Sequence, residues 1–130
     1  MIIAIDGPAG SGKSSVAKEI ARIFKFIHLD TGAMYRALTL KALRNNVNLE
    51  DEESLKNLLL NSDIKLIDDK VYLDNEDVTL KIREPIVTKN VSLVSSYKSI
   101  RDLMVKKQRE LASNNNYVLD GRDIGTVVFS

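Results

Sequence analysis

Short apolar runs that end in polar or glycine-rich turns divide the chain into strands and helices. Residues 2–5 are apolar and mostly β-branched, which is typical of a buried strand, and residues 26–29 and 117–120 have a similar pattern. Apolar side chains at helical spacing over residues 16–24 predict an amphipathic helix between the first two strands. A strand, a helix and a strand within about 30 residues predict a βαβ unit, whose two strands form a parallel pair.

The middle of the chain predicts helices and one hairpin. Helix propensity is high over residues 33–44, and an acidic first turn predicts a second helix over about 51–60. Apolar and polar positions alternate over residues 63–77, which predicts a small antiparallel hairpin. Pro85 suits the first turn of a third helix, and apolar spacing predicts a further helix over about 99–112.

These elements predict an α/β core that is interrupted by a mixed α+β insertion. We expect the core to comprise residues 1–45 and 97–130, with the insertion at residues 46–96. Only three parallel strands are predicted, which is few for a doubly wound sheet, and no helix follows the apolar residues 126–129. We therefore expect the natural protein to continue beyond residue 130.

The composition narrows the classes of function. Nineteen Lys and Arg against eighteen Asp and Glu leave a net charge of +1, so the chain lacks the long-range field that nucleic acids or anionic lipids would need. The absence of cysteine excludes disulfides, thiolate metal sites and a cysteine nucleophile, and the single histidine, His28, excludes a multi-histidine metal site. No apolar run approaches the roughly 20 residues that span a bilayer, so we expect a cytoplasmic protein.

A glycine-rich segment between the first strand and the first helix fits the phosphate-binding loop pattern G-x-x-x-x-G-K-[ST]. Glycines let backbone N–H groups wrap a phosphate, and the helix that follows offers its unpaired N–H groups and positive dipole end. Lys13 is expected to reach the β- and γ-phosphates, and the Ser14 hydroxyl to bind Mg²⁺. The alternative is a glycine-rich turn that carries a surface lysine. The expected phosphate-binding residues are Gly7, Pro8, Ala9, Gly10, Ser11, Gly12, Lys13 and Ser14.

A second candidate metal ligand ends the strand predicted at residues 117–120. Its apolar run ends in Asp120, and an acid at that place resembles the Walker B aspartate, which supports Mg²⁺ directly or through water. Many strands end in an aspartate that only caps a turn, which is the alternative for Asp120. The nearby phosphate-binding loop favours the metal role.

Three stretches together resemble bacterial cytidylate kinases: residues 5–13, residues 29–36 (Leu-Asp-Thr-Gly-Ala-Met-Tyr-Arg) and residues 120–129, which begin Asp-Gly-Arg-Asp. The last two stretches are much more specific than the phosphate-binding loop. The resemblance implies a P-loop NTPase fold, with a three-layer α/β/α core around a parallel sheet and a monophosphate-binding insertion. It also implies a monomeric transferase of pyrimidine nucleotide metabolism, which moves the γ-phosphoryl group of ATP, with Mg²⁺, to CMP or dCMP.

The family's acceptor-site residues can be carried over to matching positions of this chain. In cytidylate kinases the arginine that closes the second stretch and the arginine of Asp-Gly-Arg-Asp bind the acceptor phosphate; here they are Arg36 and Arg122. The base partners include the last aspartate of that stretch. An ionised aspartate only accepts and arginine only donates, so such a set can distinguish cytosine from uracil. The implied CMP-binding residues are Thr31, Arg36, Ser92, Arg101, Arg122 and Asp123.

The resemblance implies catalysis by charge neutralisation and alignment. A phosphate monoester has a second pKa of about 6, so the acceptor oxygen needs no general base. Lys13, Arg36 and Arg122, with Mg²⁺, would hold the two anions in line, and these three residues are the expected catalytic groups. On sequence alone, Arg36 and Arg101 could instead be solvated surface residues of helices.

The family's lid and further strands have no counterpart in the 130 residues. Because a lid excludes water and completes the phosphate clamp, we expect catalysis by this chain to be weak or absent. Two alternatives remain open: another P-loop kinase with a small acceptor, and a non-catalytic nucleotide-binding module. A nucleic-acid-binding module is disfavoured by the net charge of +1 and the 5% aromatic content.

Overall fold

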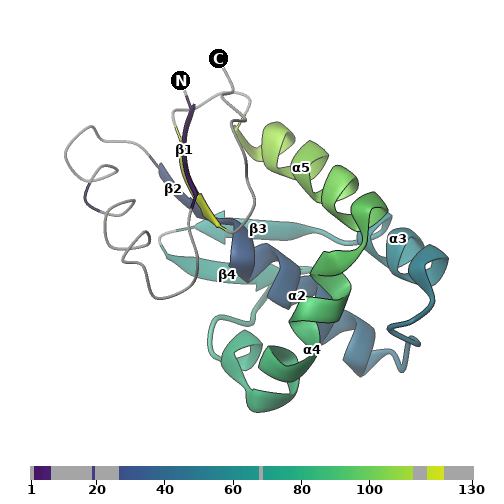
Figure 1. The fold of residues 1–130 in the computed structure, drawn as a ribbon. Helices are drawn as coiled ribbons and strands as arrows, with labels where there is room; N and C mark the ends of the chain where they lie inside the picture. Colours follow the sequence, from purple (N-terminus) through teal and green to yellow (C-terminus); the bar gives the residue numbers. More distant parts are fainter. Residues whose placement is uncertain (1, 7–18, 20–26, 68, 113–116, 122–130) are drawn as a thin grey trace. The chain divides into compact units, whose positions relative to one another are not determined.

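The computed structural model describes residues 2–6, 19, 27–67, 69–112 and 117–121. The chain divides into two compact units, which are described separately (Figure 1). The first unit combines residues 1–32 with 108–130, and the second comprises residues 33–107. The helix predicted over residues 16–24 falls outside the described residues, apart from residue 19.

The first unit contains a three-stranded parallel sheet of β1 (Ile2–Asp6), β2 (Ile27–Asp30) and β6 (Tyr117–Gly121). All three strands are confirmed to within about one residue of their predicted bounds. The predicted direct pairing of the first two strands is wrong, because the order is β1-β6-β2 and β6 pairs in parallel with both. Local patterns reveal a βαβ unit, but they carry no signal for a strand that enters between its two strands from far along the chain.

Four helices belong wholly or largely to the second unit. The helix α2 (Thr31–Arg44) begins two residues before the prediction, and α3 (Glu52–Leu60) begins after Asp51, whose carboxylate caps it by accepting from the Ser54 amide at 3.1 Å. The helix α4 (Pro85–Ser96) has Pro85 in its first turn, as predicted, and α5 (Lys98–Ala112) ends where expected. A short 3₁₀ turn, η1 (Lys81–Arg83), precedes α4.

The predicted hairpin forms within a three-stranded antiparallel sheet of β3 (Ile64–Ile67), β4 (Lys70–Leu73) and β5 (Glu76–Asp77). Ile64 pairs with Leu73, so the alternating apolar residues come together as the pattern predicts. The strand β5 was not predicted, because its two acidic residues carry no apolar signal. It follows a two-residue turn at Asp74 and Asn75, whose φ angles of 49° and 69° suit the positive-φ hairpin turns that Asn and Asp tolerate.

The core of the second unit draws buried side chains from every one of its helices and from the antiparallel sheet. In α3 the buried residues Leu55 and Leu59 lie four positions apart, so this helix presents one apolar stripe to the core, whereas α2 is buried at four consecutive positions, 37–40, and so on more than one face. The 3₁₀ turn contributes Ile82, which is fully buried. The described apolar residues with no exposed surface are Met34, Ala37, Leu38, Ala42, Leu55, Leu59, Val78, Ile82, Val87, Val94, Ile100 and Met104.

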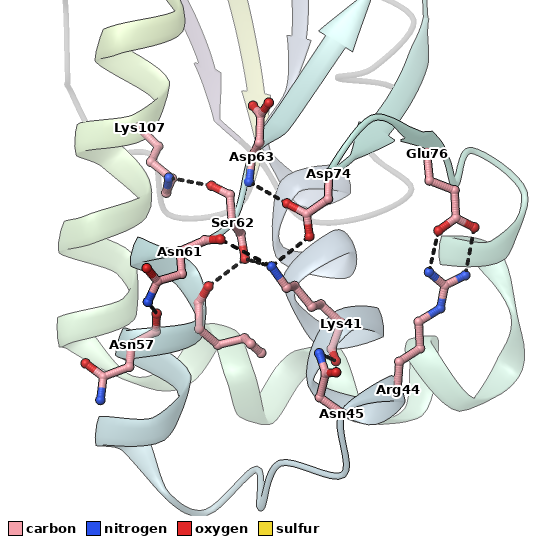
Figure 2. Close-up of polar contacts among 11 residues, drawn as sticks. Lys41, Arg44, Asn45, Asn57, Asn61, Ser62, Asp63, Asp74, Glu76 and Lys107 are labelled. Carbon is pink, nitrogen blue, oxygen red and sulfur yellow. Dashed lines mark hydrogen bonds and ion pairs between the residues drawn. The ribbon is translucent and has the colours of Figure 1, made fainter.

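A cluster of polar side chains links the residues after the end of α3 to α2 and α5 (Figure 2). The Lys41 ammonium donates to Ser62 Oγ at 2.9 Å and lies 2.7 Å from the Asp74 carboxylate, and Lys107 donates to the Ser62 carbonyl at 2.9 Å. Burial acts to raise the pKa of Asp74, but the hydrogen bond from Lys41 and the amide of Asp63 outweigh it and hold that pKa below its usual value. The two lysines also place positive charge at the C-terminal end of α3, where the helix dipole favours it.

No helix among the described residues is both long enough and apolar enough to cross a membrane. The division into units falls inside the first turn of α2 and inside α5, so it does not coincide with the predicted boundaries at residues 45 and 96. The assignment of residues 46–96 as a monophosphate-binding insertion stays a prediction.

Candidate functional site

Each of the three sequence motifs begins at the carboxyl end of a strand in the parallel sheet, and these ends lie at one edge of the sheet. Asp120 of β6 lies opposite Asp30 of β2, and the next residue, Gly121, lies opposite Asp6 of β1. The phosphate-binding loop follows Asp6, the Asp-Thr-Gly stretch contains Asp30, and the Asp-Gly-Arg-Asp stretch begins with Asp120. Because ligands of parallel α/β sheets bind outside the carboxyl ends of the strands, this edge is the candidate site of the first unit.

Several of the predicted site residues fall outside the described residues. They are the phosphate-binding loop, residues 7–14, and the two residues after Gly121, Arg122 and Asp123. Of Asp120 the structure describes the backbone, as part of β6. Among the side chains that are described, no group of three or more His, Asp or Glu could hold a metal ion. The assignment of Ser14 and Asp120 as Mg²⁺ ligands therefore stays a prediction.

Thr31 links the sheet edge to the first turn of a helix. It follows the last residue of β2 and is the first residue of α2, and only 4% of its surface is exposed. The helix was predicted to begin near residue 33, but Thr31 is already its first residue. A buried hydroxyl directly after the strand is placed at the candidate edge, which is compatible with the base-binding role that the resemblance implies.

Arg36 is fixed within the second unit by two hydrogen bonds from a single nitrogen. Its Nη1 donates to the Ile82 carbonyl at 3.1 Å and to Thr88 Oγ1 at 2.8 Å. These contacts tie the guanidinium on α2 to η1 and to the first turn of α4, so Arg36 is not a solvated surface residue. Neither partner was predicted from the sequence, because 46 and 52 positions separate them from Arg36 and no local pattern links them.

Tyr35 and Arg101 lie close together in the second unit. Burial raises the pKa of the Tyr35 hydroxyl to about 12, while the positive charge of Arg101 acts in the opposite direction. The hydroxyl is therefore protonated at neutral pH and can donate a hydrogen bond. Arg101 is exposed on α5, and its charge acts on Tyr35, the residue that precedes Arg36 on α2.

Ser92 is exposed on α4, one turn beyond Thr88. Its backbone carbonyl accepts from Ser95 Oγ at 3.2 Å. Its exposure leaves the hydroxyl accessible to a ligand, but the base-binding role of Ser92 stays a prediction, as does that of Arg101.

Comparison with known proteins points to one family. A family model described as cytidylate kinase matches residues 3–130. The cytidylate kinase of Caldanaerobacter subterraneus subsp. tengcongensis is 56% identical over 126 residues, which cover 97% of this chain and 56% of that protein. The cytidylate kinase of Fusobacterium nucleatum subsp. nucleatum is 53% identical over 129 residues, covering 99% of this chain and 59% of that protein.

The cytidylate kinase of Halalkalibacterium halodurans is 56% identical over 132 residues, covering 98% of this chain and 60% of that protein. The chain thus spans between 56% and 60% of the length of these three relatives. The similarity extends along nearly the whole chain, so it includes all three motifs at the sheet edge.

Proposed function

Because this chain belongs to the cytidylate kinase family, we propose that it takes part in transfer of the γ-phosphoryl group of ATP to CMP or dCMP, giving ADP and CDP or dCDP. The observation that carries the proposal is the register of the parallel sheet. Asp6 and Asp30 are the last residues of β1 and β2, Asp120 is the next-to-last residue of β6, and the ATP-binding and CMP-binding stretches both begin at this edge. A kinase needs this proximity, because its two substrates must be held in line.

The ATP side is assigned to the phosphate-binding loop, residues 7–14. Its backbone amides would surround the phosphates, and Lys13 would neutralise the β- and γ-oxygens. A hydroxyl from Ser14 and a carboxylate from Asp120 are oxygen donors of the kind Mg²⁺ prefers, and these residues would hold it together with ATP phosphates. When bound, Mg²⁺ supplies positive charge to the phosphate oxygens.

The acceptor side is assigned to two arginines and a set of base partners. Arg36 and Arg122 would bind the phosphate of CMP, which is already largely ionised at neutral pH and attacks without a general base. Asp123, as an acceptor, would take the exocyclic amine of cytosine, while Thr31, Ser92 and Arg101 complete the contacts to the base. Uracil presents an acceptor oxygen in place of the amine, so Asp123 would reject it.

The parallel β1-β6-β2 sheet supports assignment of the first unit to the core of a three-layer P-loop NTPase fold, with residues 46–96 as the monophosphate-binding insertion. The monomeric state and cytoplasmic location expected from the sequence remain predictions.

Transfer of label from γ-labelled ATP tests the proposal, with CMP, UMP and AMP offered separately as acceptors. We expect label in CDP in preference to UDP and ADP. Label in another acceptor would favour a different small-molecule kinase. Binding of CMP without any transfer would leave the chain a non-catalytic nucleotide-binding module.

A further inference from the structure

Arg36 makes two hydrogen bonds to neutral acceptors within the second unit. Its Nη1 donates to the Ile82 carbonyl oxygen at 3.1 Å and to the Thr88 hydroxyl at 2.8 Å. Hydrogen bonds to such groups orient a guanidinium, but unlike bonds to a carboxylate they bring no opposite charge. These two contacts therefore direct the side chain without themselves bringing a negative charge to it.

The two acceptors stand on well-fixed parts of the second unit. Ile82 is fully buried in η1, and Thr88 directly follows Val87, which is fully buried in the first turn of α4. The Thr88 amide also donates to the Glu84 carbonyl at 3.1 Å, within that first turn. Core packing thus holds both acceptors in place, and they can set the position of a long side chain that would otherwise sample many rotamers.

We propose that Thr88 is a positioning residue for the acceptor phosphate site, and that its hydroxyl holds the Arg36 guanidinium ready for the phosphate of CMP. The inference rests on the proposed function, which assigns Arg36 to that phosphate. Because the arginine side chain is ordered before the ligand arrives, less conformational entropy is lost on binding. Thr88 does not contact the reacting atoms in this scheme; it acts through Arg36.

Thr88 can be altered with little disturbance of the core, because its side chain is exposed. Thr88→Val keeps the shape and removes the hydroxyl, whereas Thr88→Ser keeps the hydroxyl and removes the methyl group. Thr88→Ala gives a second hydroxyl-free variant should the valine variant fold poorly. Melting curves of the variants establish that each remains folded before binding is measured.

The test is calorimetric titration of the chain with CMP and with cytidine, which lacks the phosphate. Loss of one net hydrogen bond predicts CMP binding weaker by about threefold to tenfold in Thr88→Val, with unchanged cytidine binding and near-original CMP binding in Thr88→Ser. In an Arg36→Ala background, Thr88→Val should have no further effect on CMP binding, because the group that Thr88 positions is gone.

The outcomes separate the inference from the function on which it rests. If Arg36→Ala weakens CMP binding but Thr88→Val does not, the positioning role of Thr88 is wrong and the acceptor site stands. An equal loss from Thr88→Val with and without Arg36, or an equal loss for CMP and cytidine, would also overturn it. If Arg36→Ala leaves CMP binding unchanged, or the original chain does not bind CMP, the proposed acceptor site falls and the inference falls with it.

Discussion

Asp120 in β6 lies directly opposite Asp30 in β2 in the parallel register of the first unit. This pairing brings together two motifs that stand far apart in the sequence, and the register of β6 with β1 adds Asp6, from which the phosphate-binding loop departs. The edge formed by these three strand ends is where parallel α/β sheets bind their ligands. Each functional prediction below depends on residues that follow one of these strands.

Lys13 is expected to hold the phosphates of ATP. Replacing it by alanine removes the positive charge that stabilises the negative charge developing on the phosphates. Any transfer activity should therefore fall on the order of 10²–10³-fold, and ATP binding should weaken. Lys18→Ala is the matched control, because this lysine lies on the polar side of the helix predicted over residues 16–24. Equal effects of the two substitutions on ATP titrations would contradict the role of Lys13.

Arg36 is expected to bind the phosphate of CMP rather than its base. Arg36→Ala should weaken CMP binding by at least about tenfold, the usual scale for a charge-assisted hydrogen bond, and should leave cytidine binding unchanged. Arg44→Ala serves as the control on the same helix, because its guanidinium pairs with Glu76 at 2.7 Å. The assignment would be wrong if both variants bound CMP as the original chain does.

Lys41 is expected to stabilise the second unit. Its side chain is only 16% exposed and joins α2 to Ser62 and Asp74, so Lys41→Met should lower the free energy of unfolding by about 1–3 kcal/mol. Lys98→Met removes a lysine from a much more exposed pair, 3.0 Å from Asp102, and should cost about 0.3–0.5 kcal/mol. Urea unfolding measures the free energy of unfolding of both variants. Similar losses in the two would show that the cluster in Figure 2 stabilises the chain no more than an exposed ion pair does.

Glu76 makes stability depend on pH in a defined direction. Hydrogen bonds from Arg44 and Lys81 lower its pKa from 4.5 to about 2. Because the pKa is lower in the folded chain, its contribution is fully present above pH 4.5 and is lost as the pH falls toward 2. Glu76→Gln should therefore be less stable than the original chain at pH 7, and the difference should shrink between pH 4.5 and pH 2.

Urea unfolding of both chains over that pH range measures this difference. Added salt should also reduce it, since the pairs are partly exposed and are screened. A difference between the two chains that stays constant from pH 7 to pH 2 would show that the Glu76 carboxylate is not stabilised by its partners.

The elements of the fold could be predicted from the sequence because their signals are local. The apolar strands, the acidic first turn of α3 and Pro85 at the start of α4 each act within a few residues. The position of β6 between β1 and β2 could not be predicted, since parallel pairing depends on contacts between distant segments. The strand β5 has only two residues and is held by pairing with β4 rather than by an apolar pattern of its own.

The candidate site divides in the same way. Motif spacing predicts Lys13 and Asp120, and the resemblance to cytidylate kinases implies Arg36, because each of these assignments depends on a short segment. The partners of Arg36 could not be predicted, because Thr88 and the Ile82 carbonyl reach it only through the packing of η1 and α4 against the core. A hydrogen bond between an arginine and a threonine 52 positions away has no counterpart in local sequence.

The most direct test of the account is calorimetric titration of this chain with CMP, UMP and AMP, repeated with Asp123→Asn. The account predicts tighter binding of CMP than of either other nucleotide. It also predicts that Asp123→Asn narrows the preference for CMP over UMP, because an amide can donate to the uracil oxygen that a carboxylate repels. Equal binding of CMP and AMP by the folded original chain would contradict the account, as would a CMP preference that survives Asp123→Asn unchanged.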